Sequence, residues 1–557
     1  MARGGKQTVL QGAIILTAST MVVKGIGALF KIPLANILGG VGMSYFVSAY
    51  DVLIPIYSMT VTGMGVAVSR MVSERSGYGS TAAEDILKTA KTLFWGIGLA
   101  ASLLLFCFAK PLTAVIGNPT AYLSVCCIAP SVLFSCLSSA YRGYFQGKHN
   151  MLPTARSQIL EALVKLVFGI SLAWLLCQKL TESAAAGTFP WQGTPQQVQL
   201  KILQLSAAGA VLGVSFSTLC GLLFIRRQYR SNGFAGAGRF SRKDAKTLWR
   251  IALPIALTSL SANLTTVIDL SSVMNCLKSA VGQGEEKILT MYAGCIPPEV
   301  TASVLPEYLY GSYSGLAVSI FNLVPAITAG IGMSAIPAIA GYCAAGDDLC
   351  LQRSVESVMA TTAAAAFPLG LGIFTFAKEI LTFLYPSQQM EAAIVAPTLQ
   401  MMGLVSILIA FSGILNNVLQ ASGMEKTPLA ALLIGGLLKM LTNFILVSRP
   451  EVNIHGVAYG SLICYSFIVI FCAVKWFGSG RPFARAVVLL KPLLASVLCC
   501  STARSIYWLL YDVAGNTVSL LIGIAAGGFV YIGLLFWTKF IKSAEISLVF
   551  SGKNRRK

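Results

Sequence analysis

The sequence predicts an all-α integral membrane protein with about 14 transmembrane helices. Of its 557 residues, 55% are hydrophobic and only 11% are charged, whereas about a quarter of the residues in a typical soluble domain are charged. The mean hydropathy is +0.74. Apolar runs of about 20 residues, long enough to cross a hydrocarbon core of about 30 Å, recur along the whole chain. The sequence lacks the segments of about 10 residues with alternating apolar and polar side chains that are typical of a transmembrane β-barrel.

The first apolar run begins near Leu10 and continues to Phe30, with Arg3 and Lys6 before it. A cleavable signal peptide has a shorter apolar region followed by a cleavage site of small residues. We therefore expect this segment to be retained as the first membrane helix.

Charged residues, glycines and prolines bound the apolar runs and set the expected limits of the spans. The predicted spans are residues 10–32, 43–68, 90–109, 121–140, 157–178, 203–225, 251–274, 312–339, 356–376, 396–417, 428–447, 455–475, 488–510 and 517–538. One long loop on the side opposite the termini is expected over residues 276–311.

Lysine and arginine are distributed unevenly between the two sets of loops. An even number of spans places both termini on one side, and most of the 41 Lys and Arg residues fall in loops on that side. They include Arg70, Arg75, Arg142, the cluster 226–250 and the tail 553–557. By the positive-inside rule both termini are cytoplasmic. The net charge of +20 then reflects this topological bias, and some of the basic residues are expected to contact anionic membrane lipids. The basic residues are scattered along the chain and form no basic face that could bind a nucleic acid.

Two segments of the chain are similar to each other, residues 146–165 and residues 420–439. Each is a polar loop with a proline that leads into an apolar helix carrying a lysine, Lys165 or Lys439. Parallel repeats of this kind build two-lobed transporters. Chance similarity between two apolar helices that start with proline is the alternative interpretation.

The repeat predicts three parts with two pseudo-symmetric six-helix lobes. They are an N-terminal six-helix lobe (1–230), a C-terminal six-helix lobe (231–480), and two additional helices with a basic cytoplasmic tail (481–557).

The sequence gives little support for a metal site or for a catalytic nucleophile. The 14 cysteines lie mostly inside apolar runs, with spacings typical of neither a zinc site nor a disulfide framework. Cys276 and Cys295 share the predicted outward loop, where pairing is the less favoured alternative to two free thiols. The two histidines, His149 and His455, fall in different loops or helix ends, which argues against a histidine metal site or a Ser-His-Asp triad. We expect neither catalytic nor metal-ligating residues.

Ionisable residues inside the predicted spans are the candidates for a transport site. Each central Lys, Arg or Asp costs about 2.5–3.5 kcal/mol on a membrane-insertion scale, so these groups should face a wet cavity or each other. The candidates are Lys24, Lys31, Asp51, Glu161, Lys165, Asp269, Lys439 and Arg504.

Helical spacing relates some of these candidates. Glu161 and Lys165 are four residues apart, so they either neutralise each other as an ion pair or bind substrate. Lys24 and Lys31 are seven residues apart and share one helix face.

Two further candidates, Asp269 and Arg504, each have alternative roles. Asp269 is either an ion or proton site or a partner for Lys31, and the first role is favoured because carboxylates inside membranes mark ion pathways. Arg504 lies outside the repeat and is expected to snorkel toward an interface.

Three blocks of the chain resemble the stage V sporulation protein B family, in the polysaccharide branch of the multidrug/oligosaccharidyl-lipid/polysaccharide (MOP) exporter superfamily. The matching residues are 24–27 (KGIG), 30–36 (FKIPLAN) and 38–39 (LG) in the opening; 144–147 (YFQG), 150–151 (NM), 153–155 (PTA), 157–158 (SQ) and Glu161 between the fourth and fifth spans; and Lys439, Gly456 and Ala458 near the end.

The resemblance implies a two-lobed fold with a central cationic cavity and alternating access in a bacterial cytoplasmic membrane. The implied cargo is an undecaprenyl-diphosphate-linked sugar, a peptidoglycan precursor used in sporulation or cell-wall synthesis, with cell-wall synthesis enzymes as partners. Lys24 and Lys31 take the places of the family's first-helix cations, and Glu161, Lys165 and Lys439 complete the expected substrate site. The lipid II flippases carry further arginines in the second and eighth spans, where this chain has Tyr57 and the uncharged residues 319–322.

The physics of an anionic cargo is consistent with this site. A diphosphate needs cationic partners when it leaves water. An inside-negative potential favours outward movement of each negative charge by about 2.3 kcal/mol per 100 mV. No cofactor is expected, because the potential can drive transport without ATP and no Walker-type loop is present. Sodium or proton antiport through Asp269 is the alternative drive.

Two other functions compete with a flippase. A cation-coupled multidrug exporter on the same fold would line its cavity with acids and aromatics, whereas the predicted spans hold more bases than acids. An intramembrane glycosyl transferase would need an acidic catalytic loop, for which the outward loop offers Glu285, Glu286, Glu299 and Glu307. The sequence favours a transporter over an enzyme.

Overall fold

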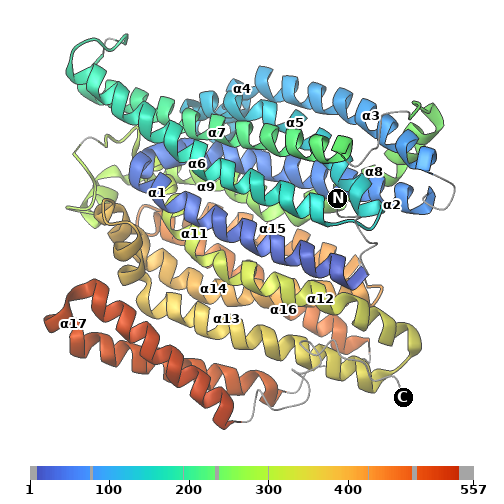
Figure 1. The fold of residues 1–557 in the computed structure, drawn as a ribbon. Helices are drawn as coiled ribbons and strands as arrows, with labels where there is room; N and C mark the ends of the chain where they lie inside the picture. Colours follow the sequence, from blue (N-terminus) through green and yellow to red (C-terminus); the bar gives the residue numbers. More distant parts are fainter. Residues whose placement is uncertain are drawn as a thin grey trace. The chain divides into compact units, whose positions relative to one another are not determined.

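The computed structural model describes residues 9–538, apart from residues 76–79, 192, 232–237, 299, 425 and 480–485. Within these ranges all regular secondary structure is helical (Figure 1). In the described part of the chain, eleven helical stretches are long and apolar enough to cross a membrane. The prediction of an all-α integral membrane protein is confirmed. The count of 14 spans and the cytoplasmic position of both termini stay predictions.

Most helices extend beyond the predicted spans. α7 and α13 each have 37 residues, about 55 Å of helix, because polar turns continue an apolar run outside the hydrocarbon core. In chain order the helices are α1 (Val9–Ser58), α2 (Gly65–Arg75), α3 (Ser80–Cys107), α4 (Ala109–Ile116), α5 (Tyr122–Gly147), α6 (Leu152–Ala185), α7 (Pro195–Ser231), α8 (Arg242–Ala262), α9 (Leu264–Met291), α10 (Leu305–Ser312), α11 (Val318–Phe321), α12 (Leu323–Ala345), α13 (Asp348–Leu384), α14 (Gln389–Ala421), α15 (Lys426–Leu446), α16 (Gly456–Gly478) and α17 (Ala486–Trp537).

α1 is a helical hairpin that turns at Gly39. This residue has φ 61° and ψ −176°, a left-handed backbone that glycine adopts without strain. A straight helix would separate Phe30 and Phe46 by about 24 Å, yet their ring centroids are 5.7 Å apart. The first arm (residues 9–38) and the second arm (residues 40–58) therefore pack against each other and contain the first predicted span and most of the second, which continues through residues 59–64 into α2.

α17 turns in the same way at Gly515, where φ is 71°. Its two arms approach closely, because a Cβ on Gly523 would lie 2.8 Å from the carbonyl oxygen of Ala503. At the open end, Lys491 Nζ donates to the carbonyl oxygen of Thr538 at 3.4 Å. The last two predicted spans form this hairpin.

Residues 276–311, predicted as one long outward loop, are mostly helical, so the prediction of a loop was wrong, while the outward position of the segment stays a prediction. α9 continues to Met291 with a kink at Gly284, and α10 begins at Leu305. The many polar residues in this part of α9 led to the prediction of a loop. The inward side of the helix is nevertheless apolar, with Ile288 fully buried. Cys276 and Cys295 are both free thiols, as the favoured interpretation expected.

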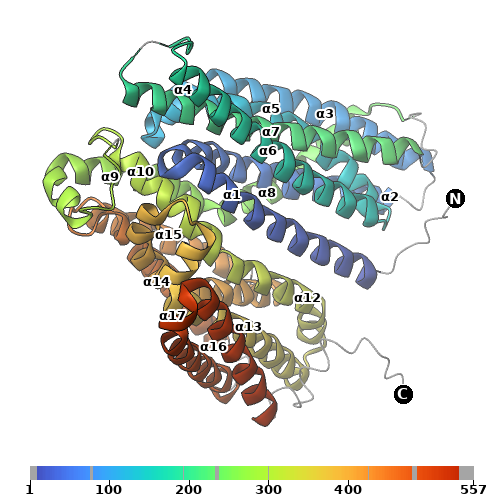
Figure 2. The ribbon, with the colours of Figure 1, turned by 60° about the vertical axis from the view of Figure 1, so that its left-hand side comes forward.

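Contacts divide the chain into two compact units. Unit 1 comprises residues 1–315 together with residues 448–453. In it, α6 packs against α7 and the α1 hairpin, and α5 packs between α3 and α7 (Figure 2). Residues 448–453 join unit 1 through Tyr292, whose hydroxyl donates to Asn453 Oδ1 at 2.6 Å.

Unit 2 comprises residues 316–447 and 454–557. α13 packs against α12, α14 and α17, while α15 pairs with α16 around a core that includes the fully buried Trp476. Arg504 of α17 forms an ion pair with Glu379 of α13. Its expected position at a membrane interface stays a prediction.

Candidate functional site

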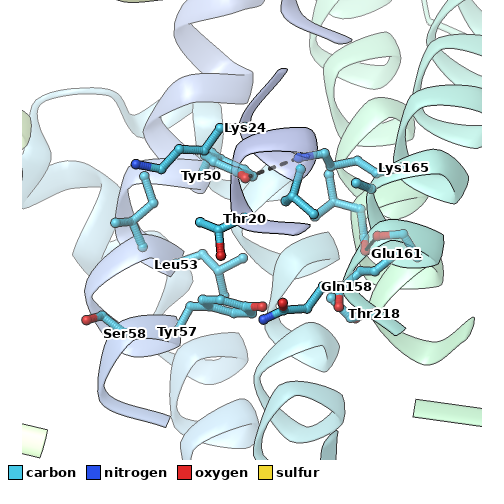
Figure 3. A pocket seen from close by; sticks show the side chains of 15 residues that line it. Thr20, Lys24, Tyr50, Leu53, Tyr57, Ser58, Gln158, Glu161, Lys165 and Thr218 are labelled. Atoms are coloured by element: carbon cyan, nitrogen blue, oxygen red, sulfur yellow. Dashed lines mark hydrogen bonds between the residues drawn. The ribbon is translucent and has the colours of Figure 1, made fainter. Parts of the chain in front are cut away.

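Unit 1 contains a pocket of about 400 Å³. Both arms of α1 line it with residues 20–24 and 50–58, α6 contributes residues 158–165, and α7 contributes residues 214–218 (Figure 3). The walls combine aliphatic side chains with hydroxyls, one amide and three charged groups. A mostly apolar pocket with a few convergent polar groups is the usual form of a small-molecule site.

Lys165 lines this pocket from α6. Its Nζ lies 3.5 Å from the hydroxyl of Tyr50 (Figure 3). It also lies 5.4 Å from the ring centroid of Phe30. These contacts with aromatic groups orient the ammonium group without neutralising it. No carboxylate of the described residues lies within ion-pair distance of Lys165.

Lys24 lines the same pocket from the first arm of α1. Its side chain is exposed and forms neither a hydrogen bond nor an ion pair with the part of the chain that the structure describes. The structure thus brings Lys24, Glu161 and Lys165 together, as the sequence predicted for a substrate site. Their role in binding stays a prediction.

Glu161 is the one carboxylate among the described residues that line the pocket. Its Oε2 accepts from Nη2 of Arg142 at 2.7 Å, and no ion pair joins it to Lys165 in the described part of the chain. Of the two interpretations of Glu161 and Lys165, the self-neutralising pair is therefore wrong. Helical spacing allows such a pair, but the buried guanidinium of Arg142 on α5 offers Glu161 a better-matched donor.

Arg142 was predicted in a cytoplasmic loop, and the structure corrects this. It lies within α5, where its side chain is only 3% exposed. Nη2 also donates to Ser157 Oγ at 2.9 Å, and Nη1 donates to the hydroxyl of Tyr57 at 3.3 Å. Arg142 is the residue that sequence reasoning missed, because the predicted span ended at residue 140. The aromatic residues Tyr144 and Phe145 beyond it were the signal that the helix continues.

Lys31 and Asp269 lie outside the pocket lining. Lys31 interacts electrostatically with Asp51 and Lys165, and Asp51 interacts with Asp269. The carboxylate of Asp51 also accepts a hydrogen bond from Tyr310 at 3.4 Å. Asp51 thus interacts with both Lys31 and Asp269. Neither the ion-coupling role of Asp269 nor the substrate role of Lys31 is tested by these contacts.

Lys439 belongs to unit 2, where it lies on α15 with 3% exposure. Lys165 is the fourteenth residue of α6 and Lys439 the fourteenth residue of α15, so the two lysines occupy the same register in their helices. This matches the predicted repeat in its local geometry, while the lobes of residues 1–230 and 231–480 stay a prediction.

Among the described residues of the predicted loop, the acidic side chains form no cluster of three or more. Glu307 is buried on α10 and accepts from the hydroxyls of Tyr45 at 3.5 Å and Thr120 at 3.3 Å. Glu285 and Glu286 are exposed on α9. Glu299 lies outside the described residues. These two hydrogen bonds join Glu307 to neighbouring segments of unit 1, as expected for a structural role of this carboxylate.

Comparisons with known proteins agree with this fold over nearly the whole chain. The family model described as "Polysaccharide biosynthesis protein" matches residues 9–285, and the model described as "MatE" matches residues 312–445. Over 549 residues the chain is 25% identical to stage V sporulation protein B of Bacillus subtilis (strain 168), with 97% of each chain covered. It is 22% identical over 498 residues to lipid II flippase MurJ of the same organism, covering 83% of this chain and 82% of that protein.

A solved structure of lipid II flippase MurJ in an inward closed conformation has the same fold. Its TM-score is 0.69 at 15% identity, covering 95% of this chain and 100% of that chain. The eleven candidate spans and these relatives identify a multi-pass bacterial membrane protein, a transporter and not an enzyme. The chain belongs to a flippase family of the MOP exporter superfamily.

Proposed function

We propose that this flippase carries an undecaprenyl-diphosphate-linked sugar across the cytoplasmic membrane, and that the pocket of unit 1 binds the diphosphate. One observation carries the proposal. Lys24 and Lys165 line the pocket without a carboxylate partner among the described residues, while Arg142 neutralises the lining acid Glu161. The pocket therefore has an excess of positive charge.

An anionic cargo fits such a pocket for a physical reason. A diphosphate that leaves water needs charge-assisted hydrogen bonds, and lysine supplies three N–H donors. Two ammonium groups from different helices can contact the diphosphate from two sides. A cation-coupled multidrug exporter, the alternative function on this fold, would need uncompensated acids in the same place.

The relatives support the proposed class of sugar. The similar proteins named stage V sporulation protein B and lipid II flippase support a peptidoglycan precursor as cargo, used in sporulation or cell-wall synthesis. In this chain Tyr57 bonds to Arg142, in a span where the lipid II flippases carry an arginine. Recognition of the sugar head group is therefore proposed to differ from theirs.

Further residues belong to the proposed transport cycle. Lys31 interacts electrostatically with Lys165 and would extend the cationic path, and Lys439 occupies the matching register of the second repeat. Movement of the two lobes, residues 1–230 and 231–480, would give alternating access. The membrane potential would drive the anion outward, and sodium or proton exchange at Asp269 is the alternative drive.

Reconstitution in lipid vesicles tests the proposal. The labelled cargo is an undecaprenyl-diphosphate sugar, its exposure is followed with and without an imposed inside-negative potential, and efflux of a cationic dye is measured in parallel. We expect lipid flipping that the potential accelerates. Dye efflux without lipid flipping would instead identify a multidrug exporter.

A further inference from the structure

We propose that Arg142 sets the charge selectivity of the pocket by neutralising Glu161, although Arg142 itself does not line the pocket. This inference rests on the proposed function, because it explains why a pocket that contains a carboxylate accepts an anion. Arg142 is thus a positioning residue that acts through Glu161. Nothing in the family comparisons assigns it a role.

The contacts of Arg142 fix its guanidinium in one place. Nη2 donates to Glu161 Oε2 at 2.7 Å and to Ser157 Oγ at 2.9 Å, and Nε also donates to Ser157 at 3.2 Å. Nη1 donates to the hydroxyl of Tyr57 at 3.3 Å. All three guanidinium nitrogens therefore donate hydrogen bonds, to residues of α6 and of the second arm of α1. A flexible surface arginine would not hold Glu161 in this way.

α7 provides the space for this pair at Gly221. A Cβ on Gly221 would lie 3.2 Å from Glu161 Oε2 and 3.6 Å from Arg142 Nη2. Residues of α1, α5, α6 and α7 thus converge on one ion pair at the wall of the pocket. The side chain of Glu161 is 16% exposed and that of Arg142 only 3%, so the acid faces the pocket and the base stands behind it.

The charge balance shows what Arg142 contributes. Lys24, Lys165 and Arg142 oppose the single negative charge of Glu161, which leaves an excess of two positive charges. Without the guanidinium the carboxylate would face the cargo uncompensated, and Lys165 lies four residues further along the same helix. Glu161 would then pair with Lys165 or repel the diphosphate. Either outcome weakens anion binding and favours cations.

Charge-matched variants separate this role from simple structural support. Arg142→Gln leaves Glu161 uncompensated, whereas Arg142→Gln combined with Glu161→Gln removes both charges and keeps the excess of two. Arg142→Lys keeps the positive charge but loses the fork to Ser157 and Tyr57. The folding control is Arg75→Gln with Asp244→Asn, which removes an ion pair of 2.5 Å on other helices, away from the pocket.

The experiment measures vesicle flipping of a labelled undecaprenyl-diphosphate sugar, inhibition by inorganic diphosphate, and cationic dye efflux for each variant at equal amounts of folded protein. For Arg142→Gln we expect flipping to fall about tenfold or more, the diphosphate concentration for half-inhibition to rise, and dye efflux to increase. The double variant should recover most of the loss, and Arg142→Lys should fall between Arg142→Gln and the wild type.

Two results would overturn the inference. A double variant as impaired as Arg142→Gln would show that the pair is only structural, and wild-type selectivity in Arg142→Gln would show that Arg142 does not matter. Failure of the proposed function is distinguishable, because the wild type itself would then move dye and not lipid. In that case an unchanged dye efflux in Arg142→Gln still contradicts the role of Arg142.

Discussion

Arg504 of α17 forms an ion pair with Glu379 of α13 at 2.6 Å, and its guanidinium lies 5.3 Å from the ring centroid of Tyr507 and 5.5 Å from that of Phe376. The pair joins the C-terminal hairpin to the rest of unit 2. Because both side chains are largely shielded from solvent, each charge depends on the other for compensation. Replacing only one of the two residues should therefore weaken the packing of α17 against α13.

Arg504→Gln is expected to destabilise unit 2 by about 1–3 kcal/mol, because it leaves the carboxylate of Glu379 without its charged partner. Arg504→Gln combined with Glu379→Gln should lose less, since no charge is left uncompensated. Thermal unfolding in detergent measures both. The exposed pair of Arg70 and Glu74 provides the control, and Arg70→Gln should leave the unfolding temperature unchanged. Equal losses in the single and double variants would contradict the prediction.

Replacement of the two pocket lysines, or of Lys31 beside the pocket, should strongly reduce flipping. Lys24→Ala, Lys31→Ala and Lys165→Ala each remove a positive charge from the proposed anion path, so we expect flipping of the labelled lipid to fall about tenfold or more at unchanged amounts of folded protein. Lys179→Ala is the matched control, because Lys179 lies further along α6 on an exposed surface. Wild-type flipping in both Lys24→Ala and Lys165→Ala would refute the pocket assignment.

A larger residue at Gly311 should disrupt the contact between α1 and α10. A Cβ on Gly311 would overlap the carbonyl oxygen of Gly40, which cannot move without its helix. We expect Gly311→Ala to destabilise unit 1 by about 1–3 kcal/mol, as in other overpacked cores. In Gly282→Ala on α9 the new methyl group has open space around it, so this variant should be at least as stable as the wild type. A stable Gly311→Ala variant would contradict this close packing.

Acid should loosen the start of α13. Asp347 is the N-cap, and its side chain accepts from the amide nitrogen of Cys350 at 3.0 Å. Hydrogen bonds from this backbone lower the pKa of Asp347 below its ordinary value of 3.8. Since the pKa is lower in the folded state, the stabilisation is present above pH 3.8 and is lost as the pH falls through the folded-state pKa.

Hydrogen exchange at the Cys350 amide tests the cap. Protection should decrease in the wild type as the solution is acidified through this range. Asp347→Asn keeps a capping oxygen that does not titrate, so its protection should be independent of pH there. The same acid sensitivity in both proteins would rule out the carboxylate as its cause.

The local features of this protein could be predicted from its sequence. Apolar runs, bounding charges, and prolines such as Pro153 located most of the helices, since burial in lipid and helix initiation depend on neighbouring residues. Family-specific blocks near Lys24 and Glu161 identified the superfamily. The predictions failed at residues 276–311 and at Arg142, where a helix continues through polar sequence because tertiary packing supports it.

The partners of the charged groups depended on the tertiary structure. Glu161 and Lys165 have the spacing of an ion pair along one helix, but the rotation of α6 against α5 directs Glu161 to Arg142 and leaves Lys165 in the pocket. The hairpin at Gly39 brings Tyr50 and Lys24 to the same pocket. The sequence alone determined that this is a helical membrane transporter with charges inside its spans. Only the packing between helices decided which charges are compensated, because interhelical distances depend on residues far apart in the chain.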